Sequence, residues 1–235
     1  MKKLLISGGK GRFATEIIKQ NTEYEILALS KEDMDITNSE SIENVVCNFK
    51  PDIFLHPAAL TRPMIKHVQH PDISIKTNII GTSNVCLTCM KHNIKLVYIS
   101  TDFVYPGTKG DYTEEDALYP VNNYAWTKLG GECAVHIYPN SLIVRACMTE
   151  RPFVHPKALV DSKKSMLYID EAAGLCLRIL DQYGIINLGG RPTTPYEFAK
   201  TENNNVDKIF RKDIAEPMAE DTTMNIEKLK RALLC

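Results

Sequence analysis

The sequence lacks the features that mark membrane, secreted and nucleic-acid-binding proteins. It holds no run near the roughly eighteen apolar residues that a membrane-spanning helix needs. Its first apolar stretch, Lys2–Ser7, is too short for the apolar region of a signal peptide. Basic charge is not in excess, since 28 Lys and Arg residues stand against 29 Asp and Glu residues. The sequence therefore predicts a protein that binds neither membrane nor nucleic acid.

Paired cysteines are also scarce. The seven cysteines are odd in number and widely spread, which does not fit the disulfide framework of a secreted domain. Cys86 and Cys89 have the spacing of a redox motif, but they lie inside a helical pattern and no second pair completes a metal site. We expect both to be packing residues, the chain to hold no metal, and the protein to be cytoplasmic.

The sequence does contain an alternation of short β-rich segments with longer amphipathic ones. That alternation favours a parallel sheet whose crossover helices cover both faces. The predicted fold class is α/β, a doubly wound parallel Rossmann sheet with a small C-terminal substrate-binding region. The predicted strands are Lys3–Ser7, Tyr24–Leu29, Asp52–His56, Lys95–Ser100, Ser141–Arg145 and Ile185–Leu188.

Helical patterns fill the segments between these strands. One covers Asn38–Phe49, with Asn38 or Thr37 as its N-cap, a long one ends near His92, and another covers Asn123–His136. Each crossover is long enough to join parallel strands in the right-handed sense.

The composition changes after the fifth predicted strand, where prolines become frequent. We predict a dinucleotide-binding domain over residues 1–148 and a small substrate-binding region over 149–235 that packs on it and completes the sheet. Asn225–Leu234 is predicted to be a short helix, whereas Lys200–Asp221 is too irregular to assign.

A glycine-rich turn follows the first predicted strand. Gly8, Gly11 and Ala14 have the spacing that brings backbone N–H groups close to a pyrophosphate at a helix N-terminus. The phosphate-binding loop of nucleoside triphosphatases is absent, because no Gly-x-x-x-x-Gly-Lys-Ser/Thr occurs. The turn therefore predicts a dinucleotide cofactor.

The end of the second predicted strand bears on which dinucleotide is bound. Ser30 and Lys31 stand where an acidic residue would accept bonds from a ribose 2′-hydroxyl and repel a 2′-phosphate. We therefore predict NADP(H) as the preferred cofactor and leave NAD(H) open. Lys10, Arg12 and Lys31 are candidate partners of the 2′-phosphate, although each has the alternative of a solvated surface charge.

A tyrosine and a lysine lie four residues apart in the helical segment after the fourth predicted strand. Tyr124 and Lys128 would share one helix face, where the ammonium favours the ionised phenol. A phenol has an unperturbed pKa of about 10 and is a poor proton donor near neutrality unless it is tuned. We expect Lys128 to lower the pKa of Tyr124, which makes Tyr124 the proton donor.

Two further matches to Tyr-x-x-x-Lys occur, and roughly one is expected by chance. Tyr105 and Lys109 span a proline and a glycine, so they cannot share a helix face. Tyr196 and Lys200 follow the last strand, and we treat them as surface residues.

The fourth predicted strand ends in hydroxyl residues, which places them near Tyr124 at the carboxyl edge of the sheet. Thr101 could bond a substrate carbonyl or hydroxyl, the alternative being a cap at the strand end. Asp102 either orients substrate or faces water.

These stretches together resemble the extended short-chain dehydrogenase/reductase family, most closely its dTDP-4-dehydrorhamnose reductase branch, over roughly residues 3 to 148. The resemblance is carried by the following segments: Gly8 to Ala14, Asp35-Ile36-Thr37, Pro51-Asp52, Ala58-Ala59-Leu60-Thr61, Asn78-x-x-Gly81, Ile99 to Tyr105, Tyr112-x-Glu114-x-Asp116, Pro120, and Tyr124-x-x-x-Lys128-x-Gly130-x-Glu132.

The resemblance implies roles for individual residues. Thr101, Tyr124 and Lys128 would be the catalytic set, with Thr101 and Asp102 on the substrate side. Hydride would pass to the C4 keto carbon of a nucleotide-linked 6-deoxy sugar. The cofactor contacts that the resemblance implies are Gly11, Arg12 and Phe13 at the pyrophosphate, Asp35 and Ile36 at the adenine, and Ala58, Ala59, Leu60 and Lys128 at the middle and the nicotinamide ribose. Gly8 and Lys10 in the glycine turn, Ser30 and Lys31 after the second strand, and Tyr124 complete the predicted cofactor-binding set.

The residue at position 103 differs between enzymes of this fold that catalyse different reactions. The dehydratases of this fold carry glutamate there, and some epimerase-reductases carry cysteine, whereas this chain has Phe103. The resemblance therefore implies plain 4-keto reduction. It leaves two alternatives, a non-catalytic NADP-binding regulatory subunit and a nucleotide-sugar epimerase.

The chain also departs from the family pattern. His56-Pro57 replaces an Asn-Ala pair, and Met64–Gln69 replaces a segment normally rich in acidic residues. Because of these departures, the resemblance leaves open whether this chain forms a homodimer through the contacts typical of the family.

Overall fold

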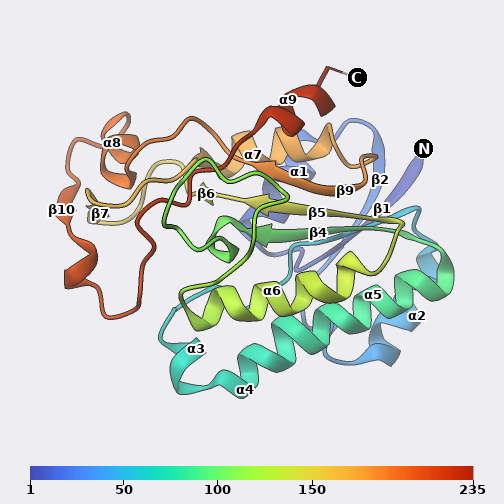
Figure 1. The fold of residues 1–235 in the computed structure, drawn as a ribbon. Coiled ribbons are helices and arrows are strands. Elements are labelled where there is room, and N and C mark those ends of the chain that lie inside the picture. The colour runs from blue at the N-terminus through green and yellow to red at the C-terminus, as the bar shows by residue number, and fades with distance from the viewer. Residues whose placement is uncertain (235) are drawn as a thin grey trace.

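Six parallel strands form the central sheet, in the order β2, β1, β3, β4, β5, β9 (Figure 1). The computed structural model describes residues 1–234. Every neighbouring pair in this sheet is parallel, which confirms the predicted doubly wound α/β class. Each predicted strand agrees with the observed one to within one residue at either end. The strands are β1 (Lys2–Ser7), β2 (Tyr24–Leu29), β3 (Ile53–His56), β4 (Lys95–Thr101), β5 (Ser141–Ala146) and β9 (Gly184–Leu188).

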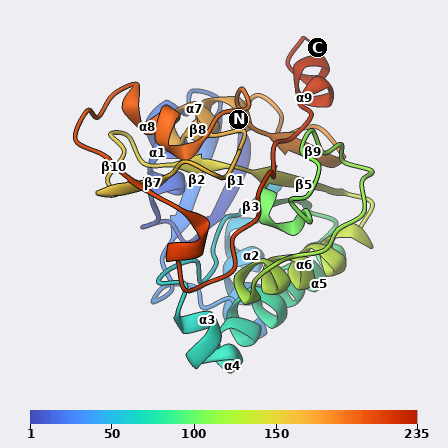
Figure 2. The ribbon, with the colours of Figure 1, turned by 60° about the vertical axis from the view of Figure 1, so that its left-hand side comes forward.

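Helices cover both faces of the sheet (Figure 2). On one face lie α1 (Arg12–Gln20) and α7 (Ile169–Leu177), and on the other lie α2 (Ser39–Phe49), α5 (Gly81–His92) and α6 (Asn123–His136). Successive residues of a strand point to opposite faces, so Leu4 and Ile6 pack in one apolar cluster and Leu5 packs in the other. Both faces are apolar, as is usual for a buried parallel sheet.

Side-chain caps fix where two of these helices begin. Asn38 accepts bonds from the backbone N–H groups of Glu40 and Ser41, so Asn38 rather than Thr37 caps α2. Asn122 accepts from the backbone N–H of Ala125 and starts α6 as predicted. The start of α6 sets the turn on which Tyr124 lies.

The long helix predicted to end near His92 is divided. It comprises α4 (Pro71–Ser74), a π-helical turn over Ile75–Ile80, and α5, preceded by the short helix α3 (Lys66–Gln69). Cys86 and Cys89 are buried in α5 within the apolar cluster of that face, as the packing interpretation predicted. No helix within residues 1–234 has the length and apolar character to cross a membrane.

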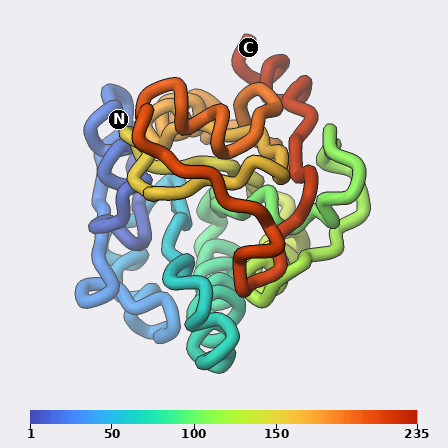
Figure 3. The backbone as a smooth tube through the Cα atoms, turned by 90° about the vertical axis from the view of Figure 1, so that its left-hand side faces the viewer, coloured from blue at the N-terminus to red at the C-terminus, as the bar shows by residue number. Residues whose placement is uncertain are grey.

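A smaller region lies beside the carboxyl ends of the sheet strands. It contains α8 (Pro195–Lys200), the 3₁₀ turn over Arg211–Asp213 and a third apolar cluster around Tyr105 and Met166. Figure 3 shows its orange and red segments crossing one side of the molecule. Its strands form two pairs, β6 (Met148–Thr149) with β8 (Leu167–Tyr168), and β7 (Lys157–Leu159) with β10 (Asp207–Ile209).

The C-terminal part of the chain also contributes to the main layers. Strand β9 is an edge strand of the sheet, α7 packs on α1, and α9 (Glu227–Ala232) lies against β9. The observed α9 falls inside the predicted helix Asn225–Leu234.

Candidate active site

A cleft of about 1030 Å³ opens at the carboxyl ends of the sheet strands, with the smaller region as its other wall. Its volume is at the upper end of the usual range for ligand sites, roughly 300 to 1000 Å³. Strand order reverses between β1 and β3, the position where ligands bind in open α/β sheets. The predicted residues that line it are Gly8, Lys10, Gly11, Arg12, Phe13, Ser30, Lys31, Asp35, Ile36, Ala58, Ala59, Thr101, Asp102, Tyr124 and Lys128.

Leu60 is the one predicted residue outside this lining. Its backbone N–H donates to Asn78 Oδ1 over 2.7 Å, and Asn78 Nδ2 donates back to its carbonyl over 2.9 Å. The same amide donates to Thr127 Oγ1 over 2.9 Å. Asn78 therefore ties the loop after β3 to α6 and keeps two walls of the cleft in register.

The glycine turn is shaped for a close backbone approach. Gly8 has a φ of 66°, in the left-handed region that disfavours side chains. A Cβ on Gly9 would lie 2.6 Å from the carbonyl carbon of Ala28 on β2. Gly11 is the N-cap of α1, so the N-terminus of that helix faces the cleft. This backbone cradle fits a pyrophosphate, and Gly9 is a member that the sequence analysis did not single out.

The predicted phosphate-binding cations each lie beside a carboxylate. Lys10 Nζ is 3.2 Å from Glu32 Oε2, and Lys31 Nζ is 4.0 Å from Asp35 Oδ2. A hydrogen bond with the Ser30 side chain and the neighbouring ammonium of Lys10 lower the pKa of Glu32 to about 2. Glu32 also lines the cleft, and it was not among the predicted site residues.

Arg12 forms an ion pair with Glu150, and Arg62 Nη1 shares the same carboxylate oxygen over 3.0 Å. The Glu150 side chain is 9% exposed and comes from the residues just after β6. It bridges the glycine turn to the loop that follows β3. Neither Arg62 nor Glu150 has a local sequence pattern that marks it.

Thr101, Tyr124 and Lys128 line the opposite end of the cleft, beside β4 and away from the glycine turn after β1. The Tyr124 ring lies edge-on to His67, with centroids 5.3 Å apart, and to Phe103, at 6.3 Å. Lys128 Nζ lies 4.1 Å from the centroid of the Tyr98 ring. The three predicted catalytic side chains are thus brought together from β4 and α6.

The expected tuning of Tyr124 by Lys128 is not what the structure shows. Burial, and then the charge of Asp102, raise the pKa of Tyr124 to about 12, against a lowering hydrogen bond with Thr101. Burial lowers the pKa of Lys128 itself to about 7, and Glu132 offsets part of that effect. Desolvation disfavours the charged form of both groups, and it is the largest cause of each shift.

A buried ion pair between Arg145 and Glu132 joins α6 to the sheet. Arg145 Nη2 and Nε bind Glu132 Oε1 over 2.5 and 3.0 Å, and Ser100 Oγ donates to Glu132 Oε2 over 2.7 Å. Tyr98 Oη donates to the Lys128 carbonyl over 3.1 Å. These contacts join α6 to β4 and β5 and fix the helix face that carries Tyr124.

The alternative in which Asp102 faces water is wrong, because Asp102 is only 3% exposed. Its Oδ2 accepts from Lys164 Nζ over 2.8 Å and from Thr222 Oγ1 over 2.6 Å. Lys164 also lines the cleft, yet in the sequence it reads as one of two adjacent lysines in a loop. Only the tertiary structure brings it to Asp102.

His56, which departs from the family pattern, has a structural role. Its Nδ1 is 2.7 Å from Ser7 Oγ and its Nε2 is 3.1 Å from Thr82 Oγ1. Burial lowers the pKa of His56 to about 3, so the ring is neutral and links β1, β3 and α5.

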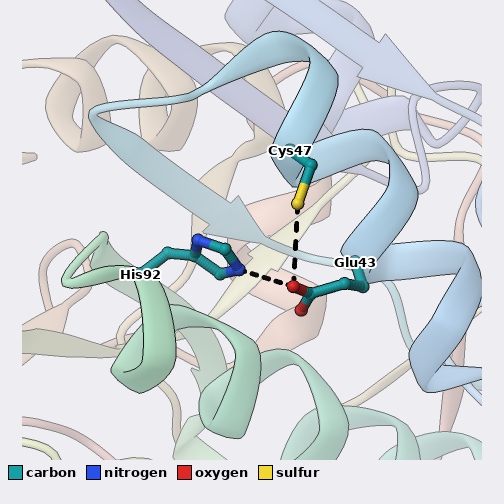
Figure 4. A group of neighbouring side chains, drawn as sticks. All are labelled: Glu43, Cys47 and His92. Carbon is teal, nitrogen blue, oxygen red and sulfur yellow. Dashed lines mark hydrogen bonds and ion pairs between the residues drawn. The ribbon is translucent and has the colours of Figure 1, made fainter.

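Within residues 1–234, one group of potential metal ligands lies close together, namely Glu43, Cys47 and His92 on α2 and α5 (Figure 4). His92 Nε2 is 2.8 Å from Glu43 Oε1, and Lys91 Nζ is 2.7 Å from that same oxygen. These two bonds lower the pKa of Glu43 to about 2. The carboxylate is thus already neutralised by the ammonium, and the group reads as a surface ion pair that ties α2 to α5.

Comparisons with known proteins agree with this geometry. The family model described as the RmlD substrate binding domain matches residues 1–149. The chain is 27% identical over 232 residues to the dTDP-4-dehydrorhamnose reductase of Aggregatibacter actinomycetemcomitans, covering 85% of this chain and 77% of the relative. It is 36% identical over 104 residues to the methionine adenosyltransferase 2 subunit beta of Rattus norvegicus, covering 44% of this chain and 31% of that protein.

Solved structures share the fold. The dTDP-4-dehydrorhamnose reductase of Bacillus anthracis in complex with NADP gives a TM-score of 0.87 at 24% identity, over 98% of this chain and 92% of that one. The orthologue from Clostridium acetobutylicum gives 0.83 at 25% identity, over 97% and 91%.

Proposed function

This chain belongs to the RmlD substrate-binding domain family, and on that premise we propose that it is an NADP(H)-dependent reductase of a nucleotide-linked 4-keto-6-deoxy sugar. Membership confirms the resemblance inferred from the sequence, and with it the class of NAD(P)-dependent oxidoreductases. One observation carries the finer proposal: Thr101, Tyr124 and Lys128 line the same cleft as the glycine turn. A cofactor held by that turn and a sugar beside Tyr124 would share this space.

The residues present fit a dinucleotide, because the glycine cradle and the N-terminus of α1 leave room for a pyrophosphate backbone. The cofactor supplies hydride, and the keto carbon that accepts it becomes a secondary alcohol. Tyr124 donates its proton to the former keto oxygen, and Thr101 donates a hydrogen bond to that same oxygen. With the cofactor bound, Lys128 would hold its nicotinamide ribose.

Burial of Tyr124 suits this direction of reaction. A phenol whose pKa is about 12 is fully protonated near neutrality, so Tyr124 carries the proton that it donates. The alkoxide formed by hydride transfer is a stronger base than the phenolate, so the proton moves toward substrate. Phe103 offers no proton-moving side chain, which favours plain reduction over dehydration or epimerisation.

The cofactor preference rests on the cations Lys10, Arg12 and Lys31. The relative from Bacillus anthracis was solved with NADP, which agrees with the sequence-based preference. We also propose that part of residues 149–234 supplies the substrate wall while the rest completes the sheet and its layers, and that the protein is cytoplasmic. A homodimer stays an open prediction, which light scattering on the purified protein would test.

The direct test is NADPH oxidation with dTDP-, UDP- and GDP-linked 4-keto-6-deoxy sugars, measured side by side at 340 nm. We expect turnover with at least one of the three, and with NADPH in preference to NADH. Dihydro-sugar product identified by mass spectrometry separates reduction from slow cofactor decay. Absence of turnover with all three contradicts the proposal.

A second function is favoured by the similarity to the methionine adenosyltransferase subunit beta of Rattus norvegicus. In this second proposal, the chain is a non-catalytic NADP-binding subunit that regulates a partner protein. Cofactor binding alone does not require Thr101, Tyr124 and Lys128 together, which argues for catalysis. NADPH binding without turnover on any of the three sugars would favour the regulatory function.

A further inference from the structure

The reacting end of the cleft contains an ion pair that the proposed chemistry does not yet use. Asp102 and Lys164 are 3% and 7% exposed, and Lys164 Nζ lies 2.8 Å from Asp102 Oδ2. Removing both charges from water is costly, and an ion pair often repays this only in part. A buried pair in a cleft is therefore a candidate for a functional role.

The two oxygens of Asp102 are bonded unequally. Oδ2 receives Lys164 Nζ at 2.8 Å and Thr222 Oγ1 at 2.6 Å, and these two donors are themselves 3.2 Å apart. Oδ1 receives the hydroxyl of Thr101 at 3.2 Å, which is long for an O–H donor. The Asp102 carboxylate is thus bonded mainly to Lys164 and Thr222 of the C-terminal region, and its hydrogen bond from the Thr101 hydroxyl is weak.

Thr101 connects this network to the proton donor. Its hydroxyl hydrogen-bonds with Tyr124, and the charge of Asp102 acts on the same phenol. The other charged or titratable groups that act on Tyr124 are Arg62, His67 and Tyr98. Lys164 also contacts the reacting end directly, because its Nζ lies 3.7 Å from the centroid of Phe103.

We propose that Lys164 is a positioning residue for the Thr101–Tyr124 pair. With Thr222 it holds Asp102 Oδ2, so that the hydroxyl of Thr101 is free to donate to the oxygen that Tyr124 protonates. Without the ammonium, the uncompensated carboxylate competes for the Thr101 proton, and its charge opposes formation of the phenolate. The role rests on the proposed reductase function.

The test compares Lys164→Met with Lys164→Arg and with the double variant Asp102→Asn/Lys164→Met. We expect Lys164→Met to lower kcat by about tenfold to a hundredfold, which is less than the roughly hundredfold to thousandfold cost of losing one donor to the reacting oxygen, because the Thr101 hydroxyl is misdirected and not removed. The KM for NADPH should stay within about twofold, because Lys164 contacts Asp102 and Phe103, neither of which is a proposed cofactor contact. The alkaline limb of the kcat–pH profile should move to higher pH.

The two companion variants distinguish positioning from structural support. Lys164→Arg keeps the charge and should retain most of kcat. The double variant removes both charges, so it should recover most of the loss and bring the pH profile back toward that of the parent protein. A double variant as slow as Lys164→Met, with an unshifted profile, would show a merely structural role and overturn the proposal.

A second measurement does not depend on turnover. In protein labelled with ¹³Cζ-tyrosine, the Tyr124 signal is assigned with Tyr124→Phe, and its ionised fraction is followed toward high pH while circular dichroism confirms the fold. Lys164→Met should ionise less than the parent protein at the same pH. Equal ionisation overturns the proposal for Lys164 even if no sugar is turned over, whereas a clear difference supports it and leaves only the substrate assignment at fault.

Discussion

The two ends of the cleft hold lysines in opposite circumstances. At the glycine-turn end, the side chains of Lys10 and Lys31 are 78% and 76% exposed and lie beside carboxylates that are themselves partly in water. At the reacting end, Lys128 and Lys164 are 2% and 7% exposed. Exposed pairs contribute little, roughly 0 to 1 kcal/mol, whereas a buried charge strongly affects its surroundings. The same residue type is therefore solvated at one end and desolvated at the other, and we propose a role in cofactor affinity for the first pair and in the chemistry for the second.

The largest expected effect is at the reacting end. Tyr124→Phe removes the proton donor and should lower kcat by about a hundredfold to ten-thousandfold, with NADPH affinity nearly unchanged. Steady-state kinetics and NADPH titration by fluorescence measure the two quantities. Tyr119→Phe, at an exposed tyrosine outside the cleft lining, is the matched control. Unchanged turnover in Tyr124→Phe would remove this residue from the acid role.

The support of α6 should show the next largest effect. Glu132→Gln leaves Arg145 buried without its partner charge and should lower the free energy of unfolding by about 3 to 5 kcal/mol. Urea unfolding followed by circular dichroism measures this. Asp116→Asn breaks the ion pair with the exposed Lys109 and should cost below about 1 kcal/mol. Equal losses in the two variants would contradict the difference in burial on which the comparison depends.

A pH dependence of stability should come from Lys128. Its pKa is about 7 in the folded protein, below the unfolded value of about 10.4. Between these values the unfolded chain binds a proton that the folded chain does not, so this group makes the free energy of unfolding rise with pH. Below pH 7 the full cost of burying the charge is present.

Lys128→Met removes that titration and keeps a chain of similar length. Its stability advantage over the parent protein should therefore be greatest near neutral pH and shrink toward alkaline pH, as measured by urea unfolding across this range. A difference that does not change with pH would mean that Lys128 is not desolvated.

The smallest effects belong to the glycine-turn end. Lys31→Met should raise the KM for NADPH by about twofold to fivefold and leave that for NADH nearly unchanged, with the difference shrinking as salt rises. Glu32→Gln should act in the opposite direction, because it removes a carboxylate beside Lys10. Equal changes with both cofactors would contradict a contact with the 2′-phosphate.

Much of this architecture could be predicted from local pattern. All six strands of the main sheet could be located from the alternation of apolar segments with amphipathic ones, because the pattern of buried and exposed positions is visible in neighbouring residues. Asn38 and Asn122 accept hydrogen bonds from backbone N–H groups two or three residues further along the chain. The residues at which α2 and α6 begin are therefore also set by neighbours in the sequence. The π-helical turn before α5 was not predicted, since the same apolar residues fit a continuous helix.

Tyr124 and Lys128 were proposed as reacting residues because their spacing has a direct chemical meaning. Tyr124 and Lys128 follow a strand that ends in hydroxyls, and the carboxyl ends of parallel strands meet at one edge of a sheet. What failed was the sign of the pKa shift of Tyr124. Spacing on a helix predicts proximity to a charge, but not how far burial removes that charge from water.

The sequence by itself determined where the strands of the sheet, the crossover helices and the glycine turn lie along the chain, because each of these segments is specified by its own neighbouring residues. Only the tertiary structure decided that Glu150 joins Arg12 to Arg62, and that Lys164 and Thr222 hold Asp102. Those partners are separated by tens of residues, and their charges lie in segments with no regular pattern. The energy of a charge depends on burial and on partners, and both are settled by the folding of distant segments against one another.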